Sequence, residues 1–468
     1  MIGYTSENYY DVVIVGAGFS GVAAAVNILR NAGSRRLRVV LVEKGTSFGR
    51  GVAYSAEADD CLLNVVAGNM SLHDDDREHF VSYCKEIGLV ADGGTFVARR
   101  HYGEYLDWAL RTEEETHPGI LSRLSGEVIS VTPELGQDRF FVRLQSGAVI
   151  SSSKVVLALG NFPPTAGFIH DSLRDRLMSP WDFAAQDRVA QHVPIIIIGT
   201  GHTAVDIVVR LSKTRPNCNF NLISRHGLIP NAHHPTTRAR PPKDYRNAFM
   251  NKRPTLRTLA SFIRREVSRS SEGNDWRDVI NDLRPEIPRF WRLMSDAERA
   301  RFVKKLRSFW DVHRHRLAPV TARKFQELIS SQRVITTAGK IVRIIPYGQY
   351  LKVIYIERGQ EVKKVMIGAV INCTGPATNP AAISSPLVRQ LITSGLLVAD
   401  KMGLGIGVNE SYNVIDSRGV ASKGLHYIGP FLRARYWEST SVPELRGHAS
   451  RVAQLILNSL VRDGNYSS

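Results

Sequence analysis

Residues 11–21 join a short apolar run to three closely spaced glycines, a combination that can bind the pyrophosphate of a dinucleotide. The apolar run has the length of a buried parallel strand, and we expect a helix to follow over residues 22–29. Gly16 allows a tight turn, Gly18 lets the backbone approach the pyrophosphate, and Gly21 lets the helix pack closely on the strand. Free amide groups at the start of the helix then attract phosphate.

The second half of this fingerprint is an acid at the end of the next apolar strand. Residues 37–43 are expected to form that strand, and its last residue, Glu43, follows Gly21 by 22 positions. An acid at this spacing binds the ribose hydroxyl groups of a dinucleotide. A GxGxxG motif alone is weak evidence, but strand, glycines, helix, second strand and acid occur here as one unit. This unit predicts a nucleotide site that also includes Phe19 and Ser20; the alternative is an ordinary tight turn between a strand and a helix.

A second fingerprint of the same kind occupies residues 194–204. A wholly apolar strand precedes glycines and an alanine in the order GxGxxA, and a helix is expected over residues 205–211. This spacing predicts a second dinucleotide site, to which we assign Gly199, Gly201, His202, Thr203 and Ala204.

The residue after the next strand predicts which dinucleotide the second site prefers. The strand over residues 219–224 is followed by Arg225, 21 positions after Ala204. An acid there would repel a 2′-phosphate, whereas arginine can bind one with paired hydrogen bonds, so we expect NADPH rather than NADH. A charge-assisted contact of ~1.5–3 kcal/mol implies roughly a 10- to 150-fold preference. The alternative is that Arg225 is an ordinary surface arginine.

The composition is that of a globular protein with room for two or three domains. The chain has 468 residues, of which 43% are hydrophobic and 22% charged, and no apolar run reaches the ~18 residues of a membrane span. Residues 1–10 are too short and too polar for a signal peptide. The cysteines are far apart and form no CxxC or metal-ligand spacing, so we expect a reduced, cytoplasmic protein and exclude a flavin disulfide reductase; they are Cys61, Cys84, Cys218 and Cys373.

The net charge of +17 raises the question of a nucleic-acid partner. Most of the excess lies in residues 225–330, which contain 24 Lys or Arg against 11 Asp or Glu. The first interpretation is a solvated face on a helical segment, and the second is attraction of an anionic cofactor or substrate. Because the sequence contains no recognised nucleic-acid module, we expect no nucleic-acid partner.

Two stretches of similar length are expected to form β-meanders. They cover residues 126–160 and 339–375, and each ends in a buried strand followed by a glycine, Gly160 or Gly375. Two-dinucleotide flavoproteins return the chain to a parallel sheet in this way. We therefore assign both glycines, and Val128 in the first meander, to the cofactor sites.

The loops after the first fingerprint resemble those of a known family. Residues 49–54, Gly-Arg-Gly-Val-Ala-Tyr, and residues 62–71, Leu-Leu-Asn-Val-Val-Ala-Gly-Asn-Met-Ser, are similar to the flavin-contacting loops of a bacterial family of FAD/NAD(P)-binding proteins related to flavin-dependent monooxygenases. The family's second loop follows roughly the pattern LNVPAxxMS, and Val66 here replaces the proline. The resemblance implies that FAD is contacted by Lys44, Gly51, Asn64 and Met70.

The C-terminal part is expected to complete the flavin site. A short strand ends at Gly429, and a final helix begins at Val442, with Pro443 and Glu444 suited to its first turn. Two-dinucleotide flavoproteins commonly direct such a helix start at the flavin, so Gly429 and Val442 are assigned to FAD. An aspartate commonly follows the glycine, and Pro430 stands there instead, as in the resembled family.

Residues 231–330 do not continue the dinucleotide-binding pattern and are expected to form a helical insertion. His313 and His315 are two positions apart, which places them on different faces of a helix, and no carboxylate or cysteine is spaced to complete a metal site. We therefore predict no metal. Arg314, His315 and Arg316 could hold an acidic substrate or could form structural ion pairs.

Together these features predict an α/β protein with two Rossmann-like dinucleotide-binding domains, one for FAD and one for NADPH, and a helical insertion. We expect the FAD domain to comprise residues 1–185 and 335–468. The NADPH domain would comprise residues 186–334, with the insertion at about 231–330.

The resemblance implies an oxidoreductase, specifically a flavoprotein monooxygenase that N-hydroxylates a small amine or amino acid. NADPH would reduce FAD, and reduced FAD would react with molecular oxygen to a hydroperoxide that oxidises the nucleophilic substrate. Because the cofactors carry this chemistry, no catalytic residue is assigned. A Baeyer–Villiger enzyme is disfavoured because residues 160–182 lack the expected histidine spacing. The alternatives are an FAD-dependent NADPH dehydrogenase or reductase without oxygen insertion, and a non-enzymatic flavin redox sensor.

Overall fold

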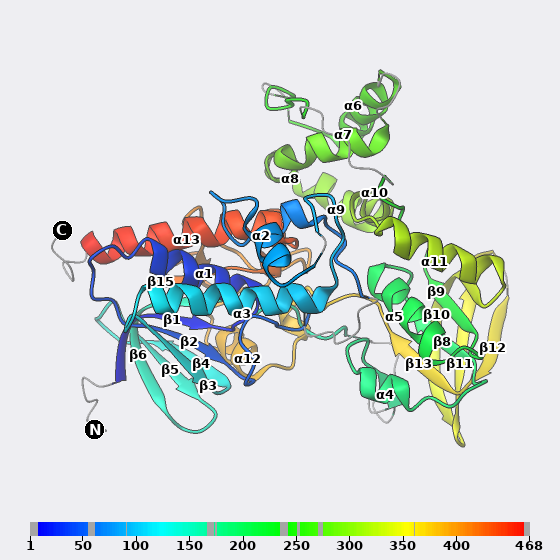
Figure 1. Ribbon diagram of the computed structural model, residues 1–468, viewed down its shortest axis with the longest axis horizontal. Helices are drawn as coiled ribbons and strands as arrows, with labels where there is room; N and C mark the ends of the chain where they lie inside the picture. The colour runs from blue at the N-terminus through cyan, green and yellow to red at the C-terminus, as the bar shows by residue number, and fades with distance from the viewer. Residues whose placement is uncertain are drawn as a thin grey trace. The chain divides into compact units, whose positions relative to one another are not determined.

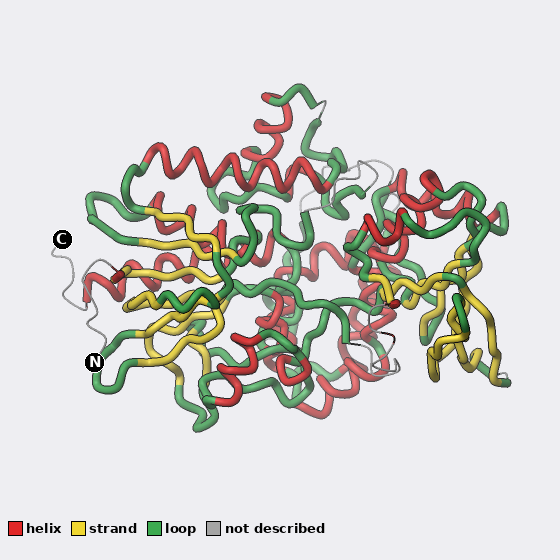
Figure 2. Tube along the Cα trace, turned by 90° about the horizontal axis from the view of Figure 1, so that it is seen from below, coloured by secondary structure: helices red, strands yellow, loops and turns green. Residues whose placement is uncertain are grey.

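The computed structural model describes residues 8–54, 61–89, 91–165, 173, 176–234, 242–249, 253–269, 275–359 and 361–462. The chain forms two compact units, each built on one β-sheet (Figure 1). The first unit comprises Met1–Glu57, Val66–Phe162 and Ala377–Ser468, and the second comprises Ala58–Val65 and Pro163–Pro376. Within each unit, helices run along the strands (Figure 2). No helix among the described residues is long and apolar enough to cross a membrane.

The sheet of the first unit has a parallel centre in the order β15-β6-β1-β2-β3. Strand β14 pairs antiparallel with β15, and β4 and β5 form a meander that leads antiparallel into β6. The strands are β1 (Tyr9–Val15), β2 (Val39–Glu43), β3 (Leu121–Ser125), β4 (Val128–Pro133), β5 (Phe140–Leu144), β6 (Val149–Leu157), β14 (Asn413–Ile415) and β15 (Ala421–Tyr427). The valine, isoleucine and leucine residues of β1 and β2 are buried, as the continuous apolar runs in the sequence predict.

Helix α1 (Phe19–Arg30) is the central helix of the first unit. It packs against α3 (Arg99–Thr116) and α13 (Val442–Arg462) as well as against the sheet. Residues 19–29 are therefore all buried, which explains why this helix is apolar on every side. The remaining helical segments of the unit are α2 (His79–Glu86), α12 (Pro386–Thr393), η2 (Ala67–Asn69), η5 (Pro380–Ala382) and η6 (Pro430–Ala434).

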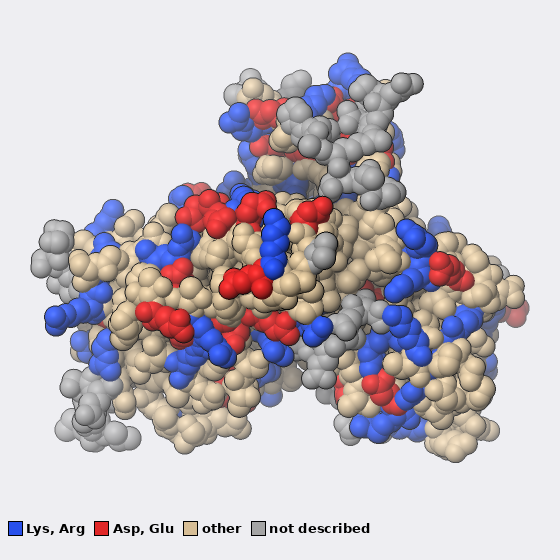
Figure 3. Space-filling model, viewed as in Figure 1, with Lys and Arg blue, Asp and Glu red and all other residues tan. Residues whose placement is uncertain are grey.

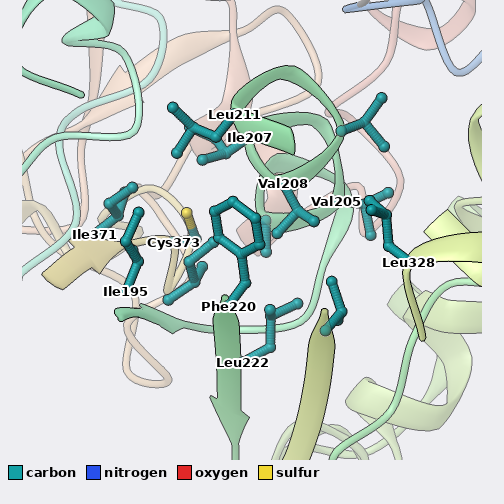
Figure 4. Packing of buried hydrophobic residues seen from close by; sticks show 14 of the residues in the cluster. Ile195, Val205, Ile207, Val208, Leu211, Phe220, Leu222, Leu328, Ile371 and Cys373 are labelled. Atoms are coloured by element: carbon teal, nitrogen blue, oxygen red, sulfur yellow. The ribbon is translucent and has the colours of Figure 1, made fainter. Parts of the chain in front are cut away.

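The sheet of the second unit has the order β12-β11-β10-β9-β8-β13-β7. Its first strands in the chain are β7 (Leu177–Met178), β8 (Ile195–Ile198) and β9 (Phe220–Ser224), followed later by β10 (Val334–Tyr347), β11 (Tyr350–Glu357), β12 (Val362–Ile367) and β13 (Ala369–Asn372). Helices α5 (His202–Thr214) and α11 (Pro319–Ser330) cover the apolar face that is shown in Figure 4. There Phe220 lies among Val208, Ile195 and Ile371.

The helical insertion belongs to the second unit and has a small apolar core of its own. Its helices are α6 (Leu256–Ser268), α7 (Trp276–Leu283), η4 (Arg284–Glu286), α8 (Ile287–Leu293), α9 (Asp296–Lys305) and α10 (Arg307–Arg314). Tyr245, Val279, Leu283 and Phe290 form the buried centre of this core. Part of the insertion, including residues 235–241, lies outside the described residues. A short helix, α4 (Phe183–Asp187), precedes β8.

The structure contains both meanders that the sequence predicts. In the first unit β4 and β5 lead into β6, which lies beside β1; in the second unit β10, β11 and β12 lead into β13, which lies beside β8. The second unit therefore extends to Pro376, beyond the predicted domain boundary at residue 334. The physical reason is backbone pairing, because β10 hydrogen bonds to β9 and β13 hydrogen bonds to β8.

We predict that Phe220→Ala destabilises the second unit by about 3–5 kcal/mol, because the Phe220 ring is 1% exposed and its removal would leave a cavity between the sheet and α5. Calorimetric unfolding of the purified protein measures this change. Leu135→Ala is the control, since that side chain is 99% exposed and its loss should leave the unfolding curve unchanged. Equal unfolding curves for Phe220→Ala and wild type would contradict the packing.

Candidate functional site: two dinucleotide cradles

In the first unit, the carboxyl ends of four parallel strands form one straight row. The register pairs Val42 with Val15, Val15 with Leu157, and Leu157 with Tyr427. The residues that follow this row in the chain include Glu43, Gly16 and the segments that lead to Gly160 and Gly429. The register therefore brings predicted FAD residues from four distant parts of the sequence to one edge of the sheet, where open α/β sheets bind their ligands.

The glycines of the first fingerprint are required by backbone contacts. Gly16 has φ = +101°, and a Cβ there would lie 2.4 Å from the Ala158 carbonyl oxygen. A Cβ on Gly21 would lie 1.8 Å from the Gly16 carbonyl oxygen, so the start of α1 packs directly on the turn. These contacts show why no side chain fits at either position.

Gly18 differs from its two neighbours because open space surrounds it. It is the N-cap residue of α1, and a Cβ there would meet only the Gly51 Cα, at 3.8 Å. Gly51, from the loop after β2, has φ = +52°. Two glycines thus face each other across the uncapped start of a helix. This arrangement fits a pyrophosphate, which needs close backbone approach and free amide groups.

Glu43 lies beside the glycine turn. Its Oε2 accepts a hydrogen bond from the Ala17 amide at 2.7 Å, and its Oε1 accepts one from the Gly45 amide at 3.3 Å. The backbone amide of Gly126 also donates to the Glu43 carbonyl oxygen at 2.8 Å, which brings the start of β4, with Val128, to this position. The carboxylate is therefore fixed at the strand end where a ribose-binding acid is expected.

The remaining predicted residues near this turn have different environments. Phe19 and Ser20 are buried, so their backbone rather than their side chains would face a ligand. Lys44 is exposed. Tyr102, which the sequence analysis missed, is fully buried and stacks on Phe19 with ring centroids 6.4 Å apart. Its hydroxyl has no hydrogen-bond partner among the described residues, so this buried polar atom fits an acceptor supplied by a cofactor.

The segment around Met70 is held by the first turns of α13. Met70 is 2% exposed, and Arg446 Nη1 donates to the carbonyl oxygen of the next residue, Ser71, at 2.9 Å. Arg446 Nε also lies 3.2 Å from Asp74 Oδ1. Arg446, which the sequence analysis missed, therefore ties the Met70 loop to the helix that begins at Val442. Its only sequence signal is a charge on a helix face that is otherwise apolar.

Gly160 and Gly429 meet at the edge of the same sheet. Gly160 has φ = +62° and Gly429 has φ = +136°, and a Cβ on Gly429 would lie 3.8 Å from the Gly160 amide nitrogen. The Tyr427 hydroxyl accepts the amide hydrogen of Phe431 at 3.1 Å. This bond and Pro430 fix the turn in which two-dinucleotide flavoproteins commonly carry an aspartate.

Asn64, which is predicted to contact FAD, lies in the second unit, as does Gly375, which lies in the predicted FAD domain. The Asn64 carbonyl oxygen lies 3.1 Å from His233 Nε2, and because a carbonyl can only accept, His233 is the donor. Burial, followed by the charge of Arg316, lowers the pKa of His233 to about 3, so the ring is neutral at pH 7. That Asn64 contacts FAD stays a prediction.

The second unit repeats the cradle of the first. The register pairs Asn372 with Ile198 and Ile198 with Ile223, which aligns Gly199 with the ends of the neighbouring strands. Gly199 has φ = +113°, and a Cβ there would lie 2.3 Å from the Cys373 carbonyl oxygen. The same contact occurs between Gly16 and Ala158 in the first unit, so the glycine turns of the two fingerprints are packed in the same way.

Gly201 is the counterpart of Gly18. It is the N-cap residue of α5, makes no side-chain cap, and a Cβ there would meet no atom of the described residues within 4 Å. His202 and Thr203 form the first helical residues, and Ala204 is buried against the sheet. The open space at an uncapped helix start again fits a pyrophosphate. Gly375 has φ = +90°, and a Cβ there would also meet no atom within 4 Å.

Arg225 directly follows β9 and is exposed, so its guanidinium can reach a ligand at this edge of the sheet. Thr200, which the sequence analysis did not single out, is buried between the two fingerprint glycines. Its Oγ1 bonds to Ser224 Oγ at 3.0 Å and donates to the Leu228 carbonyl oxygen at 2.5 Å. Thr200 thus connects the glycine turn to the segment that follows Arg225.

The basic helical insertion carries many local ion pairs. Arg289 pairs with Glu286 at 2.8 Å, Arg301 with Glu298 at 2.6 Å, and Arg307 with Asp311 at 3.4 Å. Figure 3 shows acidic and basic side chains close together on the visible face of this part of the chain rather than one continuous basic surface. These pairs favour the interpretation of a solvated, charged helical segment.

His313 is exposed near the C-terminal end of α10, and its Nδ1 is occupied within its own helix. This Nδ1 lies 2.7 Å from the Phe309 carbonyl oxygen. Among the described residues, one group has the spacing of metal ligands, namely His234, Asp275 and Asp278. The Asp275 carboxylate forms an ion pair with Arg277 at 2.5 Å and caps α7, so these contacts already account for its position.

The fold and the paired cradles define a protein with two dinucleotide-binding units in one chain. Residues 13–162 match the FAD-NAD(P)-binding family, so the predicted relationship to this family is confirmed for that part of the chain. L-Ornithine N(5)-monooxygenase from Burkholderia cepacia is 24% identical over 247 residues, which cover 48% of this chain. The alignment covers 53% of that relative, so the chain spans about half of its length.

Solved structures of flavin monooxygenases share the fold. The ornithine N-hydroxylase of Kutzneria sp. 744 superimposes with a TM-score of 0.68 at 15% identity, covering 96% of this chain and 99% of the other. The L-lysine 6-monooxygenase of Pseudomonas syringae gives 0.67 at 15% identity, covering 96% and 100%. These similarities confirm the predicted α/β fold class with its two dinucleotide-binding units.

We predict that Gly18→Ala yields a folded protein that has lost FAD, because the new methyl group would occupy the space meant for pyrophosphate and would clash with no described protein atom. Gly201→Ala is the matched variant in the second unit and should retain FAD but bind NADP⁺ at least tenfold more weakly, on the order of 1.4 kcal/mol. Flavin absorbance and NADP⁺ titration measure both effects. Full flavin content in Gly18→Ala would count against the FAD assignment.

We also predict that Arg225→Ala raises the Michaelis constant for NADPH roughly 10- to 150-fold and hardly changes that for NADH, because only NADPH carries the 2′-phosphate. Steady-state kinetics with both dinucleotides test this expectation. A similar rise in the Michaelis constants for NADPH and NADH would mean that Arg225 has a structural role instead.

Proposed function

We propose that this chain is an FAD-dependent, NADPH-consuming monooxygenase that N-hydroxylates a small amine or amino acid. The observation that carries the proposal is the presence of two dinucleotide cradles in one chain, each with a glycine in open space at an uncapped helix start, Gly18 and Gly201. The similarity to an L-ornithine N(5)-monooxygenase supports the type of reaction. Small molecules and molecular oxygen would be its partners, and the cytoplasm its location.

The chemistry itself would be supplied by the bound cofactors, since FAD can accept a hydride from NADPH and can react with oxygen. The overall reaction balances as RNH₂ + O₂ + NADPH + H⁺ giving RNHOH + H₂O + NADP⁺. NADPH provides the two electrons, one oxygen atom enters the substrate, and the other leaves as water. The protein must therefore bind two dinucleotides, orient them and keep water out.

The residues of the first unit suit the task of retaining FAD. Glu43 is held where it can accept hydrogen bonds from ribose hydroxyls, and the amides at the start of α1 can bind the diphosphate. Arg446 fixes the Met70 segment against α13. These groups would bind and orient the cofactor.

The region before α13 suits a site from which water is excluded. Trp437, Glu438 and Ser439 are almost fully buried there. His448 lies between the Tyr412 hydroxyl, 2.8 Å from Nδ1, and Ser439 Oγ, 3.0 Å from Nε2. Burial lowers the pKa of His448 to about 4, so this imidazole is neutral at pH 7 and adds no charge to the region.

In the second unit, Arg225 and the start of α5 suit the task of binding NADPH reversibly.

Thioredoxin reductase of Lactococcus lactis shares this general fold, with a TM-score of 0.55 at 12% identity. The four cysteines here are far apart in the sequence and all buried, so they do not provide the close redox pair of a disulfide reductase.

The test is to incubate the flavin-loaded protein with NADPH, ¹⁸O₂ and a panel that contains L-ornithine, L-lysine and cadaverine, and to analyse the products by mass spectrometry. We expect one amine to gain a single ¹⁸O atom and to stimulate NADPH oxidation. If NADPH oxidation yields only hydrogen peroxide with every amine, the result would instead support a reductase. Transfer of electrons from NADPH to an added quinone in the absence of oxygen would support the same alternative. If NADPH reduces the flavin at most once in many minutes, the result would support a non-enzymatic redox sensor.

A further inference from the structure

Two buried arginines lie at the C-terminal end of α10, the last helix of the insertion. Arg314 is the C-terminal residue of α10 and is 7% exposed, and Arg316 follows it and is 3% exposed. Burying a guanidinium is costly unless acceptors satisfy its donors. The burial of Arg316, whose Nε has no hydrogen-bond partner among the described residues, therefore calls for a physical reason beyond the solvated surface that explains the other basic residues of the insertion.

The backbone connects these arginines to the NADPH fingerprint. Thr200, between the fingerprint glycines, donates to the Leu228 carbonyl oxygen at 2.5 Å. A few residues further on, the Leu317 amide donates to the Asn231 carbonyl oxygen at 2.8 Å, and the His233 amide donates to the Leu317 carbonyl oxygen at 2.9 Å. The segment after Arg225 thus runs from the glycine turn to the backbone that carries Arg316.

Side chains make the same connection. The His226 ring, next to Arg225, lies 5.5 Å from the Phe309 ring of α10. His202, the first residue of α5, lies close enough to His233 for their charges to interact, and Arg314 and Arg316 also act on His233. The two buried arginines therefore lie in the same neighbourhood as the start of the helix that is expected to bind the dinucleotide.

Arg316 has an unfilled donor. Its Nη2 donates to Asn281 Oδ1, and its guanidinium lies 5.9 Å from the Trp276 ring centroid. Its Nε is buried and has no hydrogen-bond partner in the described part of the chain. Burial and the charges of Arg314 and Arg277 lower the pKa of Arg316 to about 10, which is still protonated at pH 7.

The nearby carboxylates are engaged elsewhere. Asp275 pairs with Arg277 at 2.5 Å and lies 3.2 Å from His234 Nε2. Asp278 Oδ2 accepts the Asp275 amide at 3.2 Å in the capping box of α7. Asp275 and Asp278 favour the charged form of Arg316, but their charges do not prevent the net downward shift of its pKa. Burial is the largest cause of that shift in pKa, and the neighbouring cations Arg314 and Arg277 add to it. Three positively charged side chains close together, one with an unfilled donor, suit an oxyanion from outside the chain.

We propose that Arg314 and Arg316 form a phosphate-binding site for the nicotinamide dinucleotide, in addition to Arg225 and the start of α5. This proposal depends on the proposed function, because that function requires a nicotinamide dinucleotide as the ligand. A phosphate oxygen would accept from the unfilled Arg316 donor, and such charge-assisted bonds are the strong ones in proteins. His233 is neutral at pH 7 and its Nε2–H donates to the Asn64 carbonyl oxygen, so this imidazole adds no competing charge.

The test compares NADP⁺ binding to FAD-loaded wild type, Arg314→Gln, Arg316→Gln and Arg316→Lys by isothermal titration calorimetry. We expect each Gln variant to raise the Kd for NADP⁺ roughly 10- to 100-fold and Arg316→Lys to raise it less, because lysine keeps the charge. Arg323→Gln, on the exposed side of α11, is the matched control and should leave Kd within about twofold, the scale of a few tenths of a kcal/mol. FAD content should be the same in all variants.

Thermal unfolding with and without NADP⁺ distinguishes a purely structural role of Arg316 from a role in binding NADP⁺. If Arg316 only holds the insertion through Asn281, its variants will lower Tm but keep the rise in Tm that NADP⁺ causes in wild type; this result would overturn the proposal. If Arg316→Gln does not fold, Arg314→Gln and Arg316→Lys still decide the question.

Two further outcomes separate this proposal from its alternatives. Unchanged Kd for NADP⁺ in folded Arg314→Gln and Arg316→Gln would overturn it, including when these variants lose affinity for an amino-acid substrate, since the site would then bind a carboxylate. A wild-type protein that binds NADP⁺ but hydroxylates no amine would overturn the proposed function alone.

Discussion

The structure depends on a close contact between two backbones, made where a parallel strand turns into a helix. Gly21 packs on the Gly16 carbonyl, and Gly16 packs on the carbonyl of Ala158, so the start of α1 lies directly against the sheet. In the second unit Gly199 packs on the Cys373 carbonyl in the same way. Because the helix start lies this close to the strand ends, its free amides and the terminal Glu43 or Arg225 reach the same edge of the sheet.

Much of this arrangement could be predicted because its determinants are local. Strand, glycine and helix follow one another within a few residues in both fingerprints, and the apolar runs of β1 and β8 indicate strands buried on both faces. The two meanders could also be predicted, because each is one continuous stretch that ends in a buried strand followed by a glycine. Gly16, Gly199 and Glu43 lie where their spacing predicts.

What could not be predicted depends on residues far apart in the sequence. The extension of the second unit to Pro376 follows from pairing of β10 with β9 and of β13 with β8, which no local pattern specifies. Arg446 bonds to Ser71 across the first unit, and Asn64 bonds to His233 within the second. Tyr102 shows no signal in the sequence, and for Arg316 the sequence left an acidic ligand and a structural ion pair as alternatives. An unfilled buried donor becomes visible only when the side chains around it are in place.

The central claim is that the chain holds two distinct dinucleotides, a resident flavin and a visiting electron donor. The most direct measurement is an anaerobic titration of the purified protein with NADPH, followed through the visible absorbance of the flavin. The account predicts a yellow protein that is bleached by one NADPH per bound flavin. A colourless protein that cannot be reconstituted with FAD, or a flavin that NADPH does not reduce, would contradict it.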